Sequence, residues 1–161
     1  MTVGRFSIPG EAVRREFAVY IMVAKPKGDG AAKLYVGKTG DNREGCNPVI
    51  SRAGNHFSFN VLHSQVRNKL VRPEKYDFEF FYTGFGTYGK LSDGKAVVNE
   101  MERRLNTLAQ EALGTMVINP YKGYTRIPAK GREQLATPAR LKKLKCLVST
   151  VGRTLRRRKR T

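Results

Sequence analysis

Residues 17–38 read FAVYIMVAKPKGDGAAKLYVGK, in which two short apolar runs, each with one tyrosine, flank a Pro- and Gly-containing segment. The runs, residues 17–23 and 33–38, are short for a helix and rich in β-branched and aromatic residues, so each predicts a strand. Residues 25–30 predict a turn, because Gly supplies positive φ and Pro a fixed φ. The whole stretch therefore predicts an antiparallel hairpin.

Alternation along these strands decides which side chains share a face. Tyr20 lies on the face opposite to an aliphatic row, and Tyr35 shares its face with Lys33 and Gly37. The two phenol groups can then lie side by side. The aliphatic row on the other face consists of Val19, Ile21 and Val23.

A helix is expected from Pro48, with Asn47 as its cap and Pro48 at an early helical position. Its apolar residues recur at helical spacing as far as Phe57. Arg52 and His56 are four residues apart, so this helix would hold a guanidinium and an imidazole on one face.

The rest of the chain alternates between helical and strand patterns. Residues 59–70 predict a helix that Pro73 ends, and residues 76–82 have the clearest period of two in the chain and predict a third strand. Residues 83–89 hold three glycines and predict a turn or a flexible rim. A helix capped by Ser92 or Asp93 follows.

Two long amphipathic helices are expected in the second half of the chain. In the first, an apolar stripe from Val97 to Leu113 is expected to face the sheet, and Glu102 borders this stripe. The residues expected to lean outward are Glu100, Arg103, Arg104 and Gln110. The second begins at Pro138. The fold class is therefore α+β, a small antiparallel three-stranded sheet flanked by helices, with a basic helical C-terminal extension.

The composition favours a polyanionic partner. The chain has 161 residues, with 31 Lys and Arg against 13 Asp and Glu and a formal charge of +18. Such a charge attracts nucleic acid, foremost DNA with RNA not excluded. No stretch approaches the ~20 apolar residues of a spanning helix, and a cytoplasmic location is expected. Cys46 and Cys146 are isolated in the sequence and predict neither a zinc site nor a disulfide.

These residues resemble the GIY-YIG nuclease family over residues 17–121. Val19-Tyr20-Ile21 stands in place of Gly-Ile-Tyr, and Tyr35-Val36-Gly37 is similar to Tyr-Ile-Gly. Residues 102–105 (ERRL) resemble the family's Glu-x-x-Leu helix. By this resemblance the site residues are Tyr20, Tyr35, Arg52, His56, Glu102 and Asn119.

The resemblance implies a metal-dependent endonuclease of restriction or homing type that hydrolyses phosphodiester bonds. Arg52 would stabilise charge on the phosphate, and Glu102 would bind Mg²⁺ or Mn²⁺, with Glu100 as a competing ligand. A tyrosine near cationic charge that favours phenolate would activate water, either Tyr20 or Tyr35, with His56 assisting it. Asn119 would hold the local structure.

The predicted domain division is an N-terminal segment (residues 1–16), a GIY-YIG-like domain (17–125) and a basic helical arm (126–161). A non-catalytic basic nucleic-acid-binding protein is the alternative function, and a dimer is expected if both strands are cut. The fold is expected to survive removal of residues 154–161, because the charged run at 156–160 has no interleaved apolar residue and can bury almost nothing. The residues predicted to bind nucleic acid are Lys33, Lys38, Arg156, Arg157, Arg158, Lys159 and Arg160.

Overall fold

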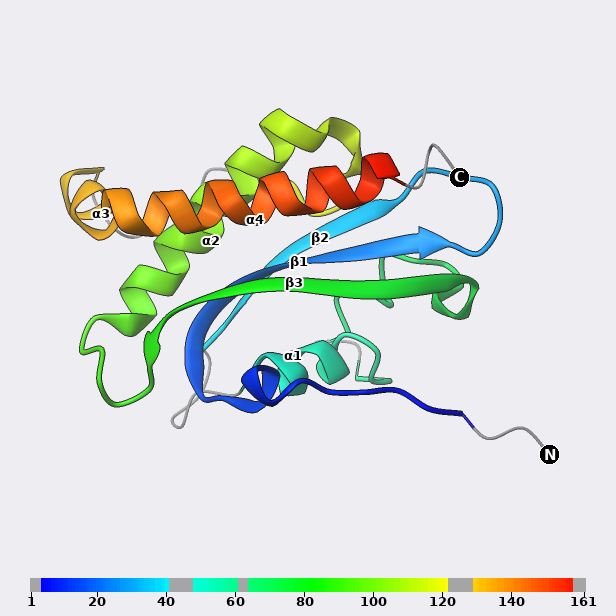
Figure 1. The fold of residues 1–161 in the computed structure, drawn as a ribbon, viewed down its shortest axis with the longest axis horizontal. Helices are drawn as coiled ribbons and strands as arrows, with labels where there is room; N and C mark the ends of the chain where they lie inside the picture. Colours follow the sequence, from blue (N-terminus) through cyan, green and yellow to red (C-terminus); the bar gives the residue numbers. More distant parts are fainter. Residues whose placement is uncertain (1–3, 41–47, 61–63, 122–128, 158–161) are drawn as a thin grey trace.

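A computed structural model describes residues 4–40, 48–60, 64–121 and 129–157. Its strands β1 (Glu16–Pro26), β2 (Lys33–Thr39) and β3 (Tyr76–Thr87) form one antiparallel sheet in the order β2-β1-β3. The predicted hairpin is confirmed, and its register sets Tyr20 opposite Gly37. Helices lie on both sides of the sheet (Figure 1), which confirms the α+β class.

The helices follow in chain order around this sheet. The 3-10 turn η1 (Gly10–Val13) precedes β1, the short helix α1 (Val49–Asn55) follows β2, and η2 (Pro73–Lys75) leads into β3. The long helix α2 (Gly94–Leu113) comes next. The remaining elements are η3 (Gly114–Met116), α3 (Ala129–Leu135) and α4 (Pro138–Arg157).

One face of the sheet is covered by α2 and α4 and holds the larger core. The aliphatic row of β1 packs there, as its alternation predicts, because successive side chains of a strand point to opposite faces. α2 lies over β1 and β2, whereas α4 lies over β3 and β1 and against α2. Buried residues on these elements include Val19, Ile21, Val23, Val36, Val97, Met101, Leu105, Leu144, Leu147 and Val151.

The opposite face carries Tyr20 and Tyr35, the two predicted site tyrosines. They belong to a second buried cluster with Met22 and with Val66 and Leu70, which follow α1 in the chain. Figure 1 shows α1 on this side of the sheet, away from α2 and α4. The sheet thus separates an aliphatic core from a tyrosine-bearing face.

The C-terminal segment contributes to the larger core. The amphipathic helix predicted from Pro138 is confirmed as α4, and Leu144 and Val151 are fully buried against the sheet and α2. Leu155 also packs on this core, as the predicted apolar stripe of this helix implies. The division into domains stays a prediction.

The third strand runs further than its sequence pattern predicts. β3 continues to Thr87, through residues expected to form a turn or rim. Its register with β1 shifts at Phe17 and Ala18, which pair with Gly86 and Gly84 on either side of Phe85. The glycines therefore accompany a β-bulge, a feature that interrupts the alternation without ending the strand.

The helix expected over residues 59–70 is wrong for the described part of that segment, which forms turns, and Phe59 is exposed. Ser58 Oγ donates to Asn55 O over 3.0 Å, and Ser64 Oγ donates to Ser58 O and Asn60 O. Serine hydroxyls that bind nearby carbonyls compete with helical backbone hydrogen bonds.

The start of α1 also differs from the prediction. Pro48 is itself the cap, with extended ψ of 163°, and is not an early helical residue. Asn47, the expected cap, precedes this cap position and lies outside the described residues. Among the described helices, no helix is long and apolar enough to cross a membrane.

Candidate functional site

The centre of the candidate site is a buried pair formed by Tyr20 and His56. Both side chains are 0% exposed, and Tyr20 Oη lies 2.5 Å from His56 Nε2. Tyr20 comes from the middle of β1, whereas His56 caps the C-terminal end of α1. The pair therefore ties α1 to the sheet.

Tyr35 completes this group from the neighbouring strand. Its ring lies edge-on to the His56 ring, with the ring centroids 4.8 Å apart. Tyr35 retains 8% exposure, so it is the one of the two tyrosines that reaches toward solvent. The expectation that the two phenols share a face is confirmed, and His56 contacts both of them.

Gly37 explains how the Tyr20 ring fits beside β2. Gly37 pairs with Tyr20 in the register, and a Cβ at this position would collide with the Tyr20 hydroxyl and ring. Only glycine leaves this space open, because every other residue carries a Cβ. Strand alternation predicts that Gly37 shares a face with Tyr35, but it does not predict the packing of Gly37 against the Tyr20 ring.

Arg52 brings positive charge to the same cluster from α1. Its charge lowers the pKa of both tyrosines and of His56, which places the guanidinium within electrostatic reach of all three. Arg52 Nε and His56 Nδ1 are buried and have no hydrogen-bond partner among the described residues. Unpaired buried polar atoms on one helix indicate a site suited to a polar ligand.

Burial, rather than charge, dominates the protonation of this cluster. It raises the pKa of both Tyr20 and Tyr35 despite the opposing effect of Arg52. Arg52, and Lys38 at Tyr35, do favour the phenolate as expected, but burial outweighs them and the pKa of both tyrosines stays raised. Burial also lowers the pKa of His56 to about 4, with Arg52 acting in the same direction, so the imidazole is neutral at pH 7.

Glu102, on α2, acts on the same cluster through its charge. Its carboxylate forms an ion pair with Lys38, at the C-terminal end of β2, and its charge raises the pKa of both tyrosines. The side chain is 26% exposed and so accessible to solvent. Among the described residues, no group of three or more His, Cys, Asp and Glu side chains is gathered for a metal.

The donor chemistry at Glu102 fits a magnesium-like ion. Mg²⁺ keeps several waters and is often held by one or two carboxylates together with substrate phosphates. Glu102 supplies one such carboxylate, and Lys38 is an ion-pair partner that an arriving cation would displace.

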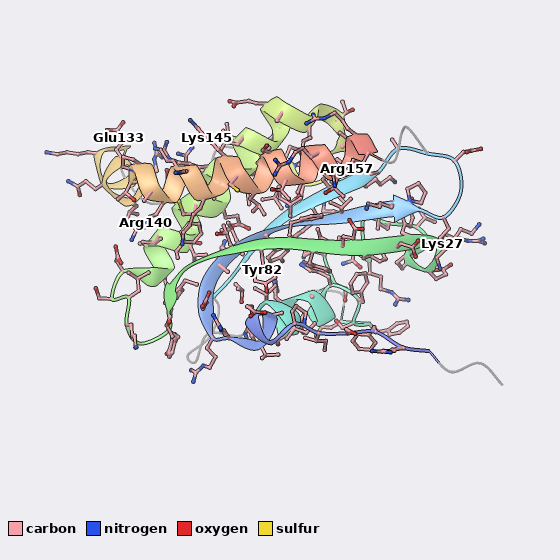
Figure 2. All side chains as sticks on the ribbon, in the orientation of Figure 1. Lys27, Tyr82, Glu133, Arg140, Lys145 and Arg157 are labelled. Carbon is pink, nitrogen blue, oxygen red and sulfur yellow. The ribbon has the colours of Figure 1, made fainter. Side chains whose placement is uncertain are left out.

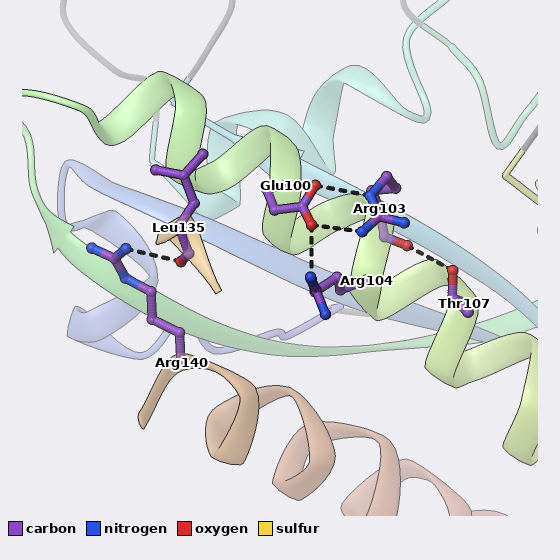
Figure 3. Close-up of polar contacts among 6 residues, drawn as sticks. All are labelled: Glu100, Arg103, Arg104, Thr107, Leu135 and Arg140. Carbon is purple, nitrogen blue, oxygen red and sulfur yellow. Dashed lines mark hydrogen bonds and ion pairs between the residues drawn. The ribbon is translucent and has the colours of Figure 1, made fainter. Parts of the chain in front are cut away.

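Glu100, the competing metal ligand, is engaged elsewhere. It is 2% exposed, accepts hydrogen bonds from Arg103 Nε at 2.8 Å and Nη2 at 2.6 Å, and accepts another from Arg104 Nε at 2.7 Å (Figure 3). The expectation that Glu100 leans outward is wrong, because these arginines neutralise it at a buried position. They lower its pKa against the opposing effect of burial. The geometry therefore favours Glu102 over Glu100.

Asn119 fixes the backbone of β2 beside Tyr35. Its Oδ1 accepts from Val36 N at 2.9 Å and its Nδ2 donates to Val36 O at 2.7 Å. Asn106, which the sequence analysis missed, donates to Asn119 O at 2.8 Å and accepts from Tyr121 N. Its signal in the sequence is an amide one turn after Glu102, within a largely apolar stripe.

The residues predicted to bind nucleic acid are dispersed. Lys33 Nζ lies 5.9 Å from the centroid of the Tyr76 ring, and Lys38 is held by Glu102. Arg156 and Arg157 are exposed in the last turn of α4. Arg158, Lys159 and Arg160 lie outside the described residues.

Comparisons with protein-family models, with curated proteins and with solved structures gave no match to this chain.

Proposed function

We propose that this protein is a metal-dependent endonuclease that hydrolyses phosphodiester bonds in DNA through a GIY-YIG-type site. One observation carries the proposal. Arg52 on α1 and Glu102 on α2 both act electrostatically on Tyr20 and Tyr35, and His56 contacts both of these tyrosines on neighbouring strands. The chain's charge of +18 supports the same polyanionic substrate.

Phosphodiester hydrolysis needs charge stabilisation where the reaction creates negative charge. Arg52 suits this task, because its planar donors match phosphate oxygens and its buried Nε has no partner among the described residues. A phosphate placed there would satisfy this donor.

Glu102 is the residue we assign to the metal. A divalent cation bound there supplies a Lewis acid for the leaving oxygen and offsets the carboxylate charge that raises the pKa of both tyrosines. Mg²⁺ and Mn²⁺ both fit an oxygen ligand of this kind.

We assign the contact with the attacking water to Tyr35. Of the two tyrosines, Tyr35 alone retains exposure, whereas Tyr20 is fully buried with its hydroxyl against His56. Tyr35 would act as a phenolate that has released its own proton to solvent: water adds to phosphorus, the Tyr35 oxygen takes the water proton, and the leaving sugar oxygen takes a proton from solvent as its bond to phosphorus breaks. Tyr20 and His56 would hold Tyr35 and the helix that carries Arg52 in position, and Asn119 fixes the backbone of β2.

The isolated positions of the two cysteines support a reducing compartment, so we propose that the enzyme acts in the cytoplasm. The alternative function, a basic binding protein without catalysis, predicts equally salt-sensitive DNA binding but no scission.

The test is Mg²⁺-dependent nicking of a supercoiled plasmid, with and without a chelator. Glu102→Gln, which keeps the shape of the side chain, should reduce nicking at least ~100-fold and leave DNA binding nearly unchanged. Glu111→Gln is the matched control, because Glu111 is an exposed carboxylate on the same helix. Nicking that persists with chelator, or equal nicking by both variants, would refute the proposal.

A further inference from the structure

The outer side of α4 carries a line of exposed basic residues, which we call the basic ridge: Lys142, Lys145, Arg153, Arg156 and Arg157. Their successive spacings of three, eight, three and one residues place them on one side of a helix with 3.6 residues per turn. The ridge extends for ~22 Å at 1.5 Å per residue.

The ridge charges are not neutralised within the described structure. α4 has no acidic residue from end to end, and none of the ridge residues forms an ion pair with any described acidic side chain. Lys143, by contrast, donates to Gly84 O at 2.7 Å and lies over the Phe85 ring, so we leave it out of the ridge. The ridge therefore offers positive charge to a partner.

The ridge faces away from the candidate site. The site is built on β1 and β2 with Tyr20 and Tyr35 on the α1 side of the sheet, whereas α4 covers the other face and lies over β3, the opposite edge strand. Figure 2 shows Lys145 on the side of α4 away from the sheet, and Tyr82 on the far side of the sheet toward α1. A straight duplex at the site cannot lie along this ridge as well.

We propose that the basic ridge of α4 is a second binding surface for the backbone of duplex DNA, so that one molecule holds two duplex segments at once. Each strand of B-DNA carries a phosphate every ~3.4 Å, so a ridge of this length can meet several phosphates. An anionic membrane fits less well, because the apolar side of α4 is buried in the core and cannot enter lipid.

This surface is independent of the proposed catalysis, and its test uses no cleavage. Cys146 lies among the ridge residues and is exposed, so its alkylation by a maleimide, followed by peptide mass spectrometry, reports on what covers α4. The probe is a duplex of about 20 base pairs in the presence of a chelator. Saturating duplex should slow Cys146 alkylation at least ~10-fold, and an unchanged rate would overturn the proposal.

Bridging is the second readout. Energy transfer between two differently labelled duplexes should appear with the intact protein and disappear in Lys142→Gln/Lys145→Gln/Arg153→Gln, which should still bind a single duplex. The matched control, Lys75→Gln/Lys90→Gln/Lys95→Gln, removes equal charge at scattered exposed positions and should keep bridging. The ridge variant should also lower the logarithmic salt slope by up to ~0.9 per lost contact.

Three results would overturn the proposal. Bridging that survives in the ridge variant would show that the ridge holds no DNA. Complete loss of binding in that variant would make the ridge the sole DNA surface. Protection of Cys146 by duplex RNA or by anionic phosphatidylserine vesicles, but not by duplex DNA, would assign the ridge to another partner.

Discussion

At the scale of single residues, the site depends on His56 remaining neutral between two phenols. Burial lowers the pKa of His56 to about 4, and the neutral ring can pair with the Tyr20 hydroxyl. Burial also raises the pKa of both tyrosines, so the site holds neutral rings around one guanidinium. Bound phosphate and metal would change this balance of charge.

The low pKa of His56 predicts that acid destabilises the fold. In the unfolded chain the imidazole binds a proton below about pH 6.5, whereas in the folded protein it stays neutral down to about pH 4. The unfolded state therefore binds more protons in this window, so stability falls as pH falls from 6.5 to 4. We expect the free energy of unfolding to drop by about 2 kcal/mol from this group between pH 7 and pH 5.

Urea denaturation at several pH values measures this effect. His56→Gln should reduce the change in unfolding free energy between pH 7 and pH 5. His63→Gln, which removes the only other histidine, should leave that change as large as in the intact protein. Equal slopes for the intact protein and His56→Gln would contradict a neutral buried His56.

At the scale of elements, β2 and α1 are positioned by contacts that only partly show in the sequence. Period-two and helical spacing predicted the hairpin, the α2 stripe and α4, because those patterns follow directly from burial of one face. The bulge in β3 and the turns after α1 were missed, since glycines and serine hydroxyls act there through particular partners. The spacing of Arg52 and His56 placed them together, but their relation to Tyr20 depends on how α1 docks.

Gly37 provides a test of this docking. Gly37→Ala would press a methyl group against the Tyr20 hydroxyl and push it from His56, so we expect a loss of about 2 kcal/mol in unfolding free energy. Nicking activity should fall with it. Gly54→Ala is the control, because nothing surrounds that position in α1, and alanine there should stabilise by up to ~1 kcal/mol. Destabilisation of both variants alike would mean that Gly37 has no special contact with Tyr20.

At the scale of the whole molecule, the sheet separates two surfaces with different chemistry. The α1 side holds the tyrosines, His56 and Arg52, and the charge of Glu102, on α2, acts on both tyrosines. The α4 side presents the basic ridge. The sequence predicted the basic helix and a polyanionic partner. That the ridge and the site face in different directions follows from the sheet order, which the sequence did not show.

The central claim is that Arg52 and Glu102 act on one phosphate as parts of one site. The most direct measurement is the single-turnover cleavage rate at saturating DNA for the intact protein, Arg52→Ala, Glu102→Gln and the double variant. Residues that work as a unit lose most of their effect with the first substitution, so the double variant should cleave about as slowly as the slower single variant. Losses that multiply across the two substitutions, or unchanged rates in either single variant, would contradict the shared site.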